Sequence, residues 1–403
     1  MSSYSETIPL VLVEGFLGFG SSNYWGSDLQ KYGARKRQLI YLDLGCVSSL
    51  HDRVCELFYQ LKGGRVDYGE EHSLKFGHQR FGKTYQGLYP QWSSTKPLHF
   101  LGHSFGGNTV WYLQHLLHQK VFVDHQDTQS DWVLSLTGIS SPLRGTPLTH
   151  TVGRYGDEIG GVHTISPGSF MYRAILLYEW LDIKWLKERV FNFNLDHWPF
   201  TPSTGMSWIE LVRHLMYGCD WAEGVDNAPY DLSVHSMETF NKIAKTHEST
   251  YYRTFAASMT YRPNWSSYHI PRFCINGALM ISSALIGRFQ NSNIEDMSSW
   301  RENDGVCPLI SQVHPGECRI DFCEHHSGLN DRPRLPQAGV WQVNELNGCN
   351  HFSIIPSIYP SLLYSEVFKD YFNYLDQIDF LEQNSNLNSV SHRASTPKLN
   401  HAI

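Results

Sequence analysis

Hydrophobic residues occur in short runs that are spaced along the first third of the chain. Short apolar or β-branched runs between turn signals are typical of buried strands. Four such runs predict strands at Pro9–Val13, Gln38–Leu44, Pro97–Leu101 and Trp132–Ile139. Between them lie segments with helical spacing of apolar residues, such as Asp52–Lys62. Strands that alternate with helices indicate an α/β fold, with a mostly parallel sheet and helices on both faces.

The pattern changes in the middle of the chain. After residue 150, strand signals become scarce and aromatic residues frequent, until strand signals return at Thr250–Ala257 and Gly339–Val343. We therefore expect a single α/β domain over residues 1–382 that carries a helical insertion at about 150–235. The segment 383–403 is rich in Asn and Ser and has few large apolar residues, which predicts a disordered tail.

Composition and charge limit the classes of function. Of the 403 residues, 41% are hydrophobic and 18% are charged, so the chain can bury a large core and is not expected to be disordered. A formal net charge of −7 gives no basic surface for a nucleic acid. The longest apolar stretches, near 174–181 and 278–287, are too short or too interrupted to cross a bilayer. We expect no nucleic-acid partner and no transmembrane segment.

The N-terminal residues and the cysteines indicate a compartment. The first residues lack the basic and apolar regions of a secretory signal. The eight cysteines form no C-x-x-C pair and are too sparse for a disulfide scaffold. We therefore expect an intracellular, cytoplasmic protein whose cysteines are free thiols.

A serine flanked by glycines is the strongest local motif. It occurs in Gly102-His103-Ser104-Phe105-Gly106, between the strand expected at Pro97–Leu101 and a segment with helical spacing. The pattern G-x-S-x-G in this setting is typical of a nucleophile elbow, a sharp turn that lifts the serine Oγ clear of the sheet at a helix N-terminus. Glycines are needed there because backbone segments approach too closely for a Cβ atom. The motif predicts that Ser104 is a nucleophile.

A serine nucleophile needs a base, and the base needs an acid that orients it. In chains with this elbow the acid precedes the base along the sequence. Asp304, in the turn-like run Glu302-Asn303-Asp304-Gly305, is a candidate acid. His351 is a candidate base, but the residues alone do not favour it over His325 or His326.

The negative charge that develops during acyl transfer needs two N–H donors. One is expected from the residue after the serine, Phe105. The other is expected from the loop after an early strand, where Glu14-Gly15-Phe16 makes Phe16 the candidate.

Several segments, in order, resemble the zinc-containing bacterial true lipases, which are the thermoalkalophilic and staphylococcal lipases of the α/β-hydrolase superfamily. The resemblance extends from about Leu10 to Phe368, and its most specific segments are Asp52–Glu56, Gln60–Gly69, Gly77–Tyr85, Tyr230–Ser233, Glu302–Gly305 and the His351 loop. It implies an α/β-hydrolase fold with a helical lid and zinc-binding insertion. It also implies that Ser104 is the nucleophile, Asp304 the acid, His351 the base, and Phe16 and Phe105 the oxyanion-hole donors.

The resemblance further implies a structural zinc ion held by Asp52, His72, His78 and Asp231. Imidazole nitrogens and carboxylate oxygens suit Zn²⁺, and four protein ligands leave no open position for catalysis. Calcium is not expected, because the acidic side chains of the family's calcium site are replaced by Ser353 and Ile358.

Two further segments bear on activity. Glu14 stands where the family usually has His, which adds a carboxylate near the expected oxyanion hole. Ser166-Pro167 is a helix start, and the residues that follow up to Leu181 are apolar around most of the helix. The resemblance implies that this helix is a lid over the acyl site. A permanently packed core helix is the alternative.

Together these features predict a serine hydrolase that cleaves acylglycerols or other lipid esters through an acyl-enzyme and contacts lipid surfaces peripherally. A phospholipase or acyltransferase with the same three residues is one alternative. A catalytically silent lipid-binding scaffold is another, and Glu14 is the feature that favours it.

Overall fold

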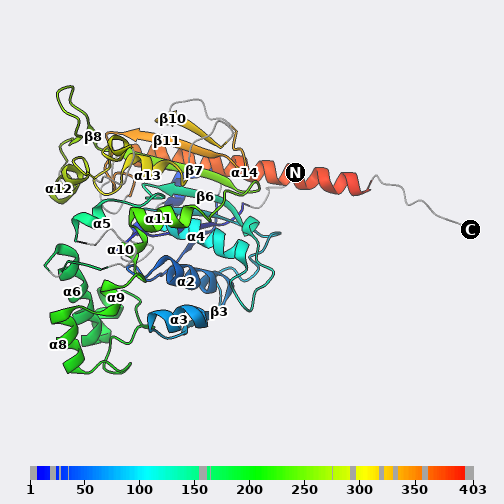
Figure 1. Cartoon of the computed structure of the whole chain (residues 1–403). Helices are drawn as coiled ribbons and strands as arrows, with labels where there is room; N and C mark the ends of the chain where they lie inside the picture. Colours follow the sequence, from blue (N-terminus) through cyan, green and yellow to red (C-terminus); the bar gives the residue numbers. More distant parts are fainter. Residues whose placement is uncertain are drawn as a thin grey trace, which may run out of the picture.

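The centre of the protein is a seven-stranded sheet with the strand order β10-β11-β7-β6-β5-β1-β2 (Figure 1). Every pairing within it is parallel. The computed structural model describes residues 7–18, 24–26, 29–34, 36–153, 161–163, 165–274, 276–290, 296–316, 322–329, 335–355 and 362–394.

The strands agree with the hydrophobic runs of the sequence. In sheet order they are β10 (Cys323–Ser327), β11 (Trp341–Asn347), β7 (Tyr251–Ser258), β6 (Val133–Ile139), β5 (Leu98–His103), β1 (Leu10–Val13) and β2 (Leu39–Tyr41). Each strand expected from the sequence is present, with ends shifted by a few residues. Strand β10 was not expected, because this edge strand consists of polar residues and lacks an apolar run.

Helices cover both faces of the sheet, as expected. Alternate residues of β1 point to opposite faces. Val11 packs in one core with α2 (Leu50–Lys62) and α4 (Phe105–Gln119), whereas Leu12 packs in a second core with α14 (Leu362–Ala394). The carboxyl ends of the parallel strands therefore form one open edge of the sheet, where loops from several strands meet.

The connection between β6 and β7 contains a series of helices. They are α5 (Leu148–Thr151), α6 (Pro167–Leu181), α7 (Lys184–Arg189), α8 (Trp208–Tyr217), α9 (Asp220–Glu223), α10 (Ala228–Asp231) and α11 (Val234–Asn241). Tyr172, Ile175 and Leu176 of α6 form a separate aromatic core with Trp198 and Trp221. In the part of the chain that the structure describes, the connection between β6 and β7 is thus helical.

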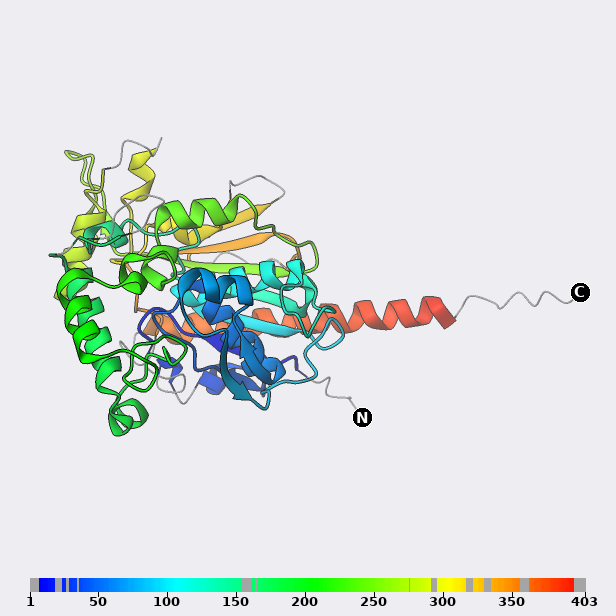
Figure 2. The ribbon, with the colours of Figure 1, turned by 60° about the horizontal axis from the view of Figure 1, so that its bottom comes forward.

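The smaller elements connect these layers. They are η1 (Leu29–Tyr32), β3 (Gly64–Asp67), α3 (Glu70–Phe76), β4 (Phe81–Tyr85), η2 (Ser130–Trp132), β8 (Thr260–Tyr261), β9 (Ile270–Pro271), α12 (Gly277–Ile286), η3 (Met297–Trp300) and α13 (Leu309–Val313). Strands β3 and β4 form an antiparallel hairpin, and so do β8 and β9. Figure 2 shows α14 extending away from the sheet at the end opposite to α12 and the helices of the insertion.

The C-terminal region differs from the expectation of a disordered tail over 383–403. Helix α14 continues to Ala394, and residues 395–403 lie outside the described part of the chain. Val367, Phe368 and Leu375 anchor the first half of α14 in the core. A helix that is already nucleated there extends at little cost, which composition alone does not reveal.

The cysteines also differ in part from expectation. Cys323 is in a disulfide bond, whereas six other cysteines are free thiols, namely Cys46, Cys55, Cys219, Cys274, Cys307 and Cys349. A disulfide depends on how close two residues lie in space, and sequence spacing does not show this. Within the described residues, no helix combines the length and the hydrophobicity that crossing a bilayer requires.

Candidate active site and metal centre

Ser104 lies at the sharp turn between β5 and α4. Its φ of 53° and ψ of −125° fall in a region that side chains rarely adopt, which is the strained geometry of a nucleophile elbow. The turn needs its glycines, since a Cβ on Gly106 would lie 2.1 Å from the carbonyl oxygen of Val13. A Cβ on Gly15 would lie 2.9 Å from the Cβ of Ser104, so the loop after β1 passes directly beside the serine.

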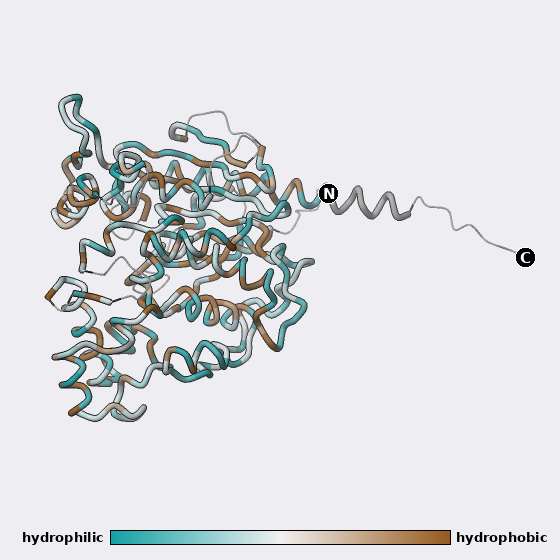
Figure 3. The backbone as a smooth tube through the Cα atoms, in the orientation of Figure 1, coloured by the Kyte–Doolittle hydropathy of each residue, from teal (hydrophilic) through white to brown (hydrophobic). Residues whose placement is uncertain are grey.

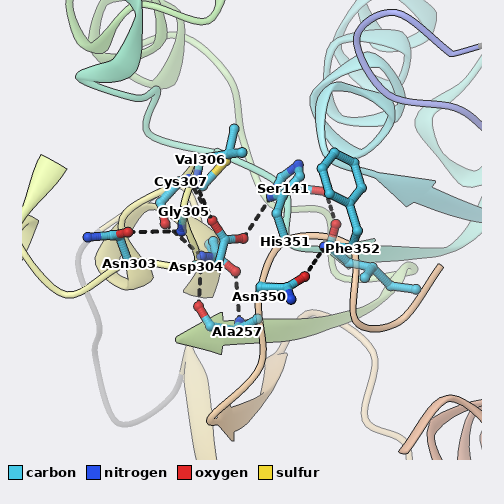
Figure 4. Close-up of polar contacts among 12 residues, drawn as sticks. Ser141, Ala257, Asn303, Asp304, Gly305, Val306, Cys307, Asn350, His351 and Phe352 are labelled. Atoms are coloured by element: carbon cyan, nitrogen blue, oxygen red, sulfur yellow. Dashed lines mark hydrogen bonds and ion pairs between the residues drawn. The ribbon is translucent and has the colours of Figure 1, made fainter. Parts of the chain in front are cut away.

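Asp304 and His351 form a pair at the same edge of the sheet (Figure 4). His351 Nδ1 lies 2.7 Å from Asp304 Oδ2, and the His351 backbone N–H donates to the Asp304 carbonyl at 2.9 Å. The other carboxylate oxygen, Oδ1, accepts from the backbone N–H groups of Val306 and Cys307. Asp304 is fully buried and these contacts fix its orientation, so it can hold one tautomer of His351.

His103 connects His351, the candidate base, to the turn that carries Ser104. Its Nε2 lies 2.9 Å from the carbonyl oxygen of His351, its Nδ1 contacts the Tyr24 hydroxyl, and its ring centre is 4.9 Å from that of His351. Burial lowers the pKa of His103 well below its usual range, so the ring is neutral. Nε2 then donates to His351 and Nδ1 accepts from Tyr24.

The pair lies beside the serine without bonding to it in this structure. Ser104 follows His103 directly, and within the described residues no hydrogen bond joins the Ser104 hydroxyl to His351. Such bonds often form only when substrate is present. The alternative bases lie on β10, where His325 Nδ1 contacts Glu345 at 3.0 Å, and neither His325 nor His326 contacts Asp304.

The two expected oxyanion donors lie on either side of Ser104. Phe105 is the first residue of α4, so its N–H has no partner within the helix. Phe16 lies in the loop after β1, and this loop is held by the Leu17 N–H, which donates to Cys46 O at 3.1 Å. Within the described residues neither Phe16 nor Phe105 uses its N–H in a hydrogen bond, which leaves both available to a ligand.

Glu14 lies at the start of this loop. Its carbonyl accepts a hydrogen bond from Arg53 at 2.7 Å, and a Cβ on Gly18 would lie 2.3 Å from its carboxylate oxygen Oε2. The Glu14 side chain therefore folds against the loop at Gly18.

Four side chains converge at a second site, between α2, α3 and the segment before α10. Asp52 Oδ1, His72 Nε2, His78 Nε2 and Asp226 Oδ2 lie within 4.8 Å of one another. His72 Nε2 is 3.2 Å from Asp52 and 3.3 Å from Asp226, and His78 Nε2 is 3.5 Å from Asp226 and 3.9 Å from Asp52. A tetrahedral ion with bonds of about 2.0 Å holds its ligand atoms about 3.3 Å apart, so the spacing fits a small metal ion.

The burial and charge of these atoms also favour a cation. All four are buried without a hydrogen-bond partner, which is costly unless a metal ion or another ligand satisfies them. Burial opposes a charge on His72, but contacts with Asp226 and Asp52 raise its pKa to about 9. The field of the two carboxylates thus favours a positive charge between the four side chains.

Asp231 is not part of this cluster, which corrects the predicted ligand set. Its carboxylate accepts the backbone N–H of Leu50 at 2.6 Å and so caps the N-terminus of α2. The physical reason is the short helix α10, which Asn227 begins by accepting the N–H of Tyr230. Asp231 lies inside this helix, whereas Asp226 precedes its cap and reaches the histidines.

Sequence reasoning also missed the residues that hold Asp52. His197 Nε2 lies 3.0 Å from Asp52 Oδ2. One carboxylate oxygen of Asp52 therefore contacts His197, while the other, Oδ1, faces the cluster. Tyr68 stacks on His197 and its hydroxyl donates to Glu56 at 3.1 Å. Burial alone would raise the pKa of Asp52, but His197 and His72 keep it well below its usual range, so Asp52 stays ionised as a metal ligand must. His197 has no neighbouring motif that marks it in the sequence.

Helix α6 begins as predicted, with Ser166 accepting the N–H of Ser169 and Pro167 in the first turn. One side of the helix packs in the aromatic core of the insertion. The other side exposes Phe170, Leu177 and Leu181, whose exposed fractions are 60%, 41% and 50%.

A family model and the similar proteins all point to lipases. A family model described as lipase-like, C-terminal domain, matches residues 6–359. The chain is 29% identical over 372 residues to a lipase of Staphylococcus hyicus, covering 86% of this chain and 53% of that protein. It is 27% identical over 373 residues to Lipase 2 of Staphylococcus aureus strain MRSA252, covering 86% and 50%. The chain thus spans about half the length of the curated relatives that it matches.

Solved structures extend the comparison to the fold. The crystal structure of Staphylococcus hyicus lipase matches with a TM-score of 0.73 and 25% identity, over 96% of this chain and 99% of that chain. EstA from Clostridium botulinum matches with a TM-score of 0.70 and 25% identity, over 93% and 88%. The seven-stranded parallel sheet with its helices is that of an α/β-hydrolase type fold, so the predicted fold class is confirmed.

Proposed function

Because the chain belongs to the lipase-like C-terminal domain family, we propose that it is a serine carboxylic-ester hydrolase that cleaves acylglycerols or other lipid esters. The observation that carries the proposal is the buried Asp304–His351 pair beside a serine in the strained backbone of an elbow. The lipases among the similar proteins support the choice of ester bonds.

The chemistry would proceed through an acyl-enzyme. The Ser104 hydroxyl attacks the ester carbonyl carbon while His351 Nε2 takes its proton, and Asp304 stabilises the imidazolium. The N–H groups of Phe16 and Phe105 stabilise the tetrahedral oxyanion. His351 returns the proton to the leaving alcohol, and water, activated by the same histidine, then releases the fatty acid and restores Ser104.

We propose that α6 is the lid of this site. Its exposed apolar side, with Phe170, Leu177 and Leu181, is unfavourable in water and suits contact with a lipid surface. A rise in hydrolysis rate when the ester passes its solubility limit supports this role. A rate that follows substrate concentration smoothly across that limit favours a permanently packed helix.

The test of the function is a comparison of wild type with Ser104→Ala on p-nitrophenyl esters and on emulsified triacylglycerol. We expect the variant to lose at least about 10⁴-fold in kcat/KM, since the nucleophile is absent. Equal hydrolysis by the two proteins would exclude Ser104 as the nucleophile and overturn the proposal.

We further propose that Asp52, His72, His78 and Asp226 hold a structural zinc ion. Two carboxylates and two imidazoles neutralise Zn²⁺ and fill its tetrahedral shell, so the ion supplies structural stability and no open position for substrate. When bound, it would link α2 and α3 to the segment that precedes α10 and follows the lid.

The two aspartates provide a matched pair for this second test. Asp226→Asn should abolish stoichiometric zinc in the purified protein and lower the free energy of unfolding by several kcal/mol, because bound metal contributes to stability. Asp231→Asn should keep the zinc and cost about 1 kcal/mol through a weaker cap on α2. Metal analysis and denaturant unfolding of both variants check these values. Zinc lost from Asp231→Asn but kept in Asp226→Asn would contradict the assignment.

A further inference from the structure

A second apolar segment flanks the candidate site, apart from the lid. It consists of residues 259–274 and 276–290, with the β8–β9 hairpin and α12, and we name it the outer flap. Trp265 and Phe273 are 82% and 86% exposed, and Ile281 and Leu285 of α12 are also exposed. Several large apolar side chains exposed within one short segment indicate a contact that is absent in free solution.

The charge of the outer flap is opposite to that of the whole chain. Between Met259 and Gln290 the sequence contains no Asp or Glu but has Arg262, Arg272 and Arg288, although the chain carries a net charge of −7. All three arginines are exposed, and none of them forms an ion pair with another described residue. Arg262 donates through Nε to the Ser266 carbonyl and Arg272 lies over the Tyr261 ring, so no described carboxylate neutralises the charge of these groups.

The outer flap is attached to the loop that carries Asp304. Asn303 donates through Nδ2 to the carbonyl of Ser283 in α12 at 3.1 Å, and Ser282 donates to the carbonyl of Gly305. Figures 1 and 2 show α12 at the same end of the molecule as α6, and Figure 3 marks hydrophobic positions in both regions. A surface that the flap contacts would thus lie next to the entrance of the candidate site.

We propose that the outer flap is a docking site for an anionic lipid surface, an inference that rests on the proposed lipid-ester hydrolysis. Trp265 and Phe273 enter the headgroup region, where aromatic side chains are favoured, and the arginines meet lipid phosphates and carboxylates. A symmetric contact between the flaps of two copies suits this face poorly, because both flaps carry the same positive charge. The docked flap orients the open edge of the sheet toward its substrate.

The experiment measures co-sedimentation of the full chain with vesicles of phosphatidylcholine, with and without phosphatidylserine. A Ser104→Ala background keeps the vesicles intact. We expect Trp265→Ala/Phe273→Ala to weaken binding to both vesicles about tenfold or more. Arg262→Gln/Arg272→Gln/Arg288→Gln should remove the preference for phosphatidylserine, on the order of 10- to 100-fold. Phe380→Ala replaces another exposed aromatic side chain, which is 63% exposed and lies on α14 outside the outer flap; it is the control and should bind like the parent.

Two outcomes would overturn the proposal. One is vesicle binding of both flap variants that equals the Phe380→Ala control. The other is a change of oligomeric state in lipid-free solution when Trp265 and Phe273 are replaced, which would assign the face to another copy. Hydrolysis of a soluble short-chain ester, measured with Ser104 present, should be unchanged by the flap substitutions. Absence of hydrolysis in the wild type would instead refute the proposed function and leave the vesicle result to stand by itself.

Discussion

Two sets of Ser, His and Asp side chains lie in the two halves of this fold, and only one of them has the features of a catalytic site. The first set is Ser104, His351 and Asp304 at the carboxyl edge of the sheet. The second lies under α14, where His99 Nδ1 contacts Ser135 Oγ at 2.7 Å and His99 Nε2 contacts Asp379 Oδ1 at 3.0 Å. In this second set the histidine is hydrogen-bonded to both the serine and the aspartate, whereas in the first set no hydrogen bond joins Ser104 to His351 within the part of the chain that the structure describes.

The backbone and the surroundings differ between the two sets. Ser135 and His99 are cross-strand neighbours near the starts of β6 and β5, and both are fully buried. Ser104 is 7% exposed and sits in a left-handed turn that faces loops. The carboxylate oxygen Oδ2 of Asp379 also forms an ion pair with an Arg37 guanidinium nitrogen at 2.9 Å, which neutralises its charge.

The comparison teaches that residue types and hydrogen bonds are insufficient to identify a catalytic site. Catalysis needs an accessible nucleophile and N–H donors that are still free to meet the developing negative charge. Near Ser104, the N–H groups of Phe16 and Phe105 make no hydrogen bond with the described residues and are the proposed donors. The set under α14 instead satisfies buried polar groups, which stabilises a unique packing of α14 against the sheet.

The largest expected difference is in turnover. His351→Ala should lower kcat/KM for a soluble ester by about 10⁴-fold, because Ser104 loses its base. His99→Ala should change kcat/KM by less than about threefold, since His99 lies under α14 near the start of β5, whereas Ser104 follows the end of that strand. Steady-state kinetics of both variants decide between the two sets. A large loss of kcat/KM in folded His99→Ala would break the comparison.

The free energy of unfolding should change more in His99→Ala than in His351→Ala, which is the reverse of the order expected for turnover. His99→Ala leaves the buried Asp379 without one of its partners and should lower the free energy of unfolding by about 3 kcal/mol. His351→Ala should cost about 1 kcal/mol or less, because catalytic residues are rarely optimised for stability. Urea unfolding measures both values, and equal values would show that the buried set has no special structural role.

The smallest effect concerns pH. Burial lowers the pKa of His99 below its usual value of about 6.5, so the folded state resists a proton that the unfolded state accepts. Stability from this residue is present above pH 6.5 and is lost as the pH falls toward the folded pKa. As the pH is lowered, the free energy of unfolding should fall more steeply for the wild type than for His99→Gln. The difference between the two slopes should be at most about 1.4 kcal/mol per pH unit. Parallel curves for the two proteins between pH 5 and 7 would contradict this origin.

Strong local patterns were sufficient to predict the sheet and the elbow. The short apolar runs and the glycines around Ser104 determine local backbone geometry, so the sequence itself contains the necessary signal. The choice of His351 over His325 rested on the resemblance to known lipases, because the residues alone left both open. In the structure His351 contacts Asp304, whereas His325 lies on the edge strand β10 and contacts Glu345.

The fourth member of the Asp52–His72–His78 cluster shows where such reasoning fails. Asp226 and Asp231 are the same residue type in one segment, and only the cap of α10 determines which one reaches His72. His197 illustrates a related limit, because it lies far from Asp52 in sequence and contacts it only in the folded chain. Contacts between distant segments depend on packing that no local pattern specifies.

The central claim is that Ser104, and not Ser135, is the activated nucleophile. Labelling of the full wild-type chain with a fluorophosphonate, followed by peptide mass spectrometry, tests it most directly, because only an activated serine reacts with such a probe. We expect one label per chain on the peptide that contains Ser104, with loss of ester hydrolysis in proportion to labelling. Label on Ser135, or full hydrolysis after Ser104 is labelled, would contradict the assignment.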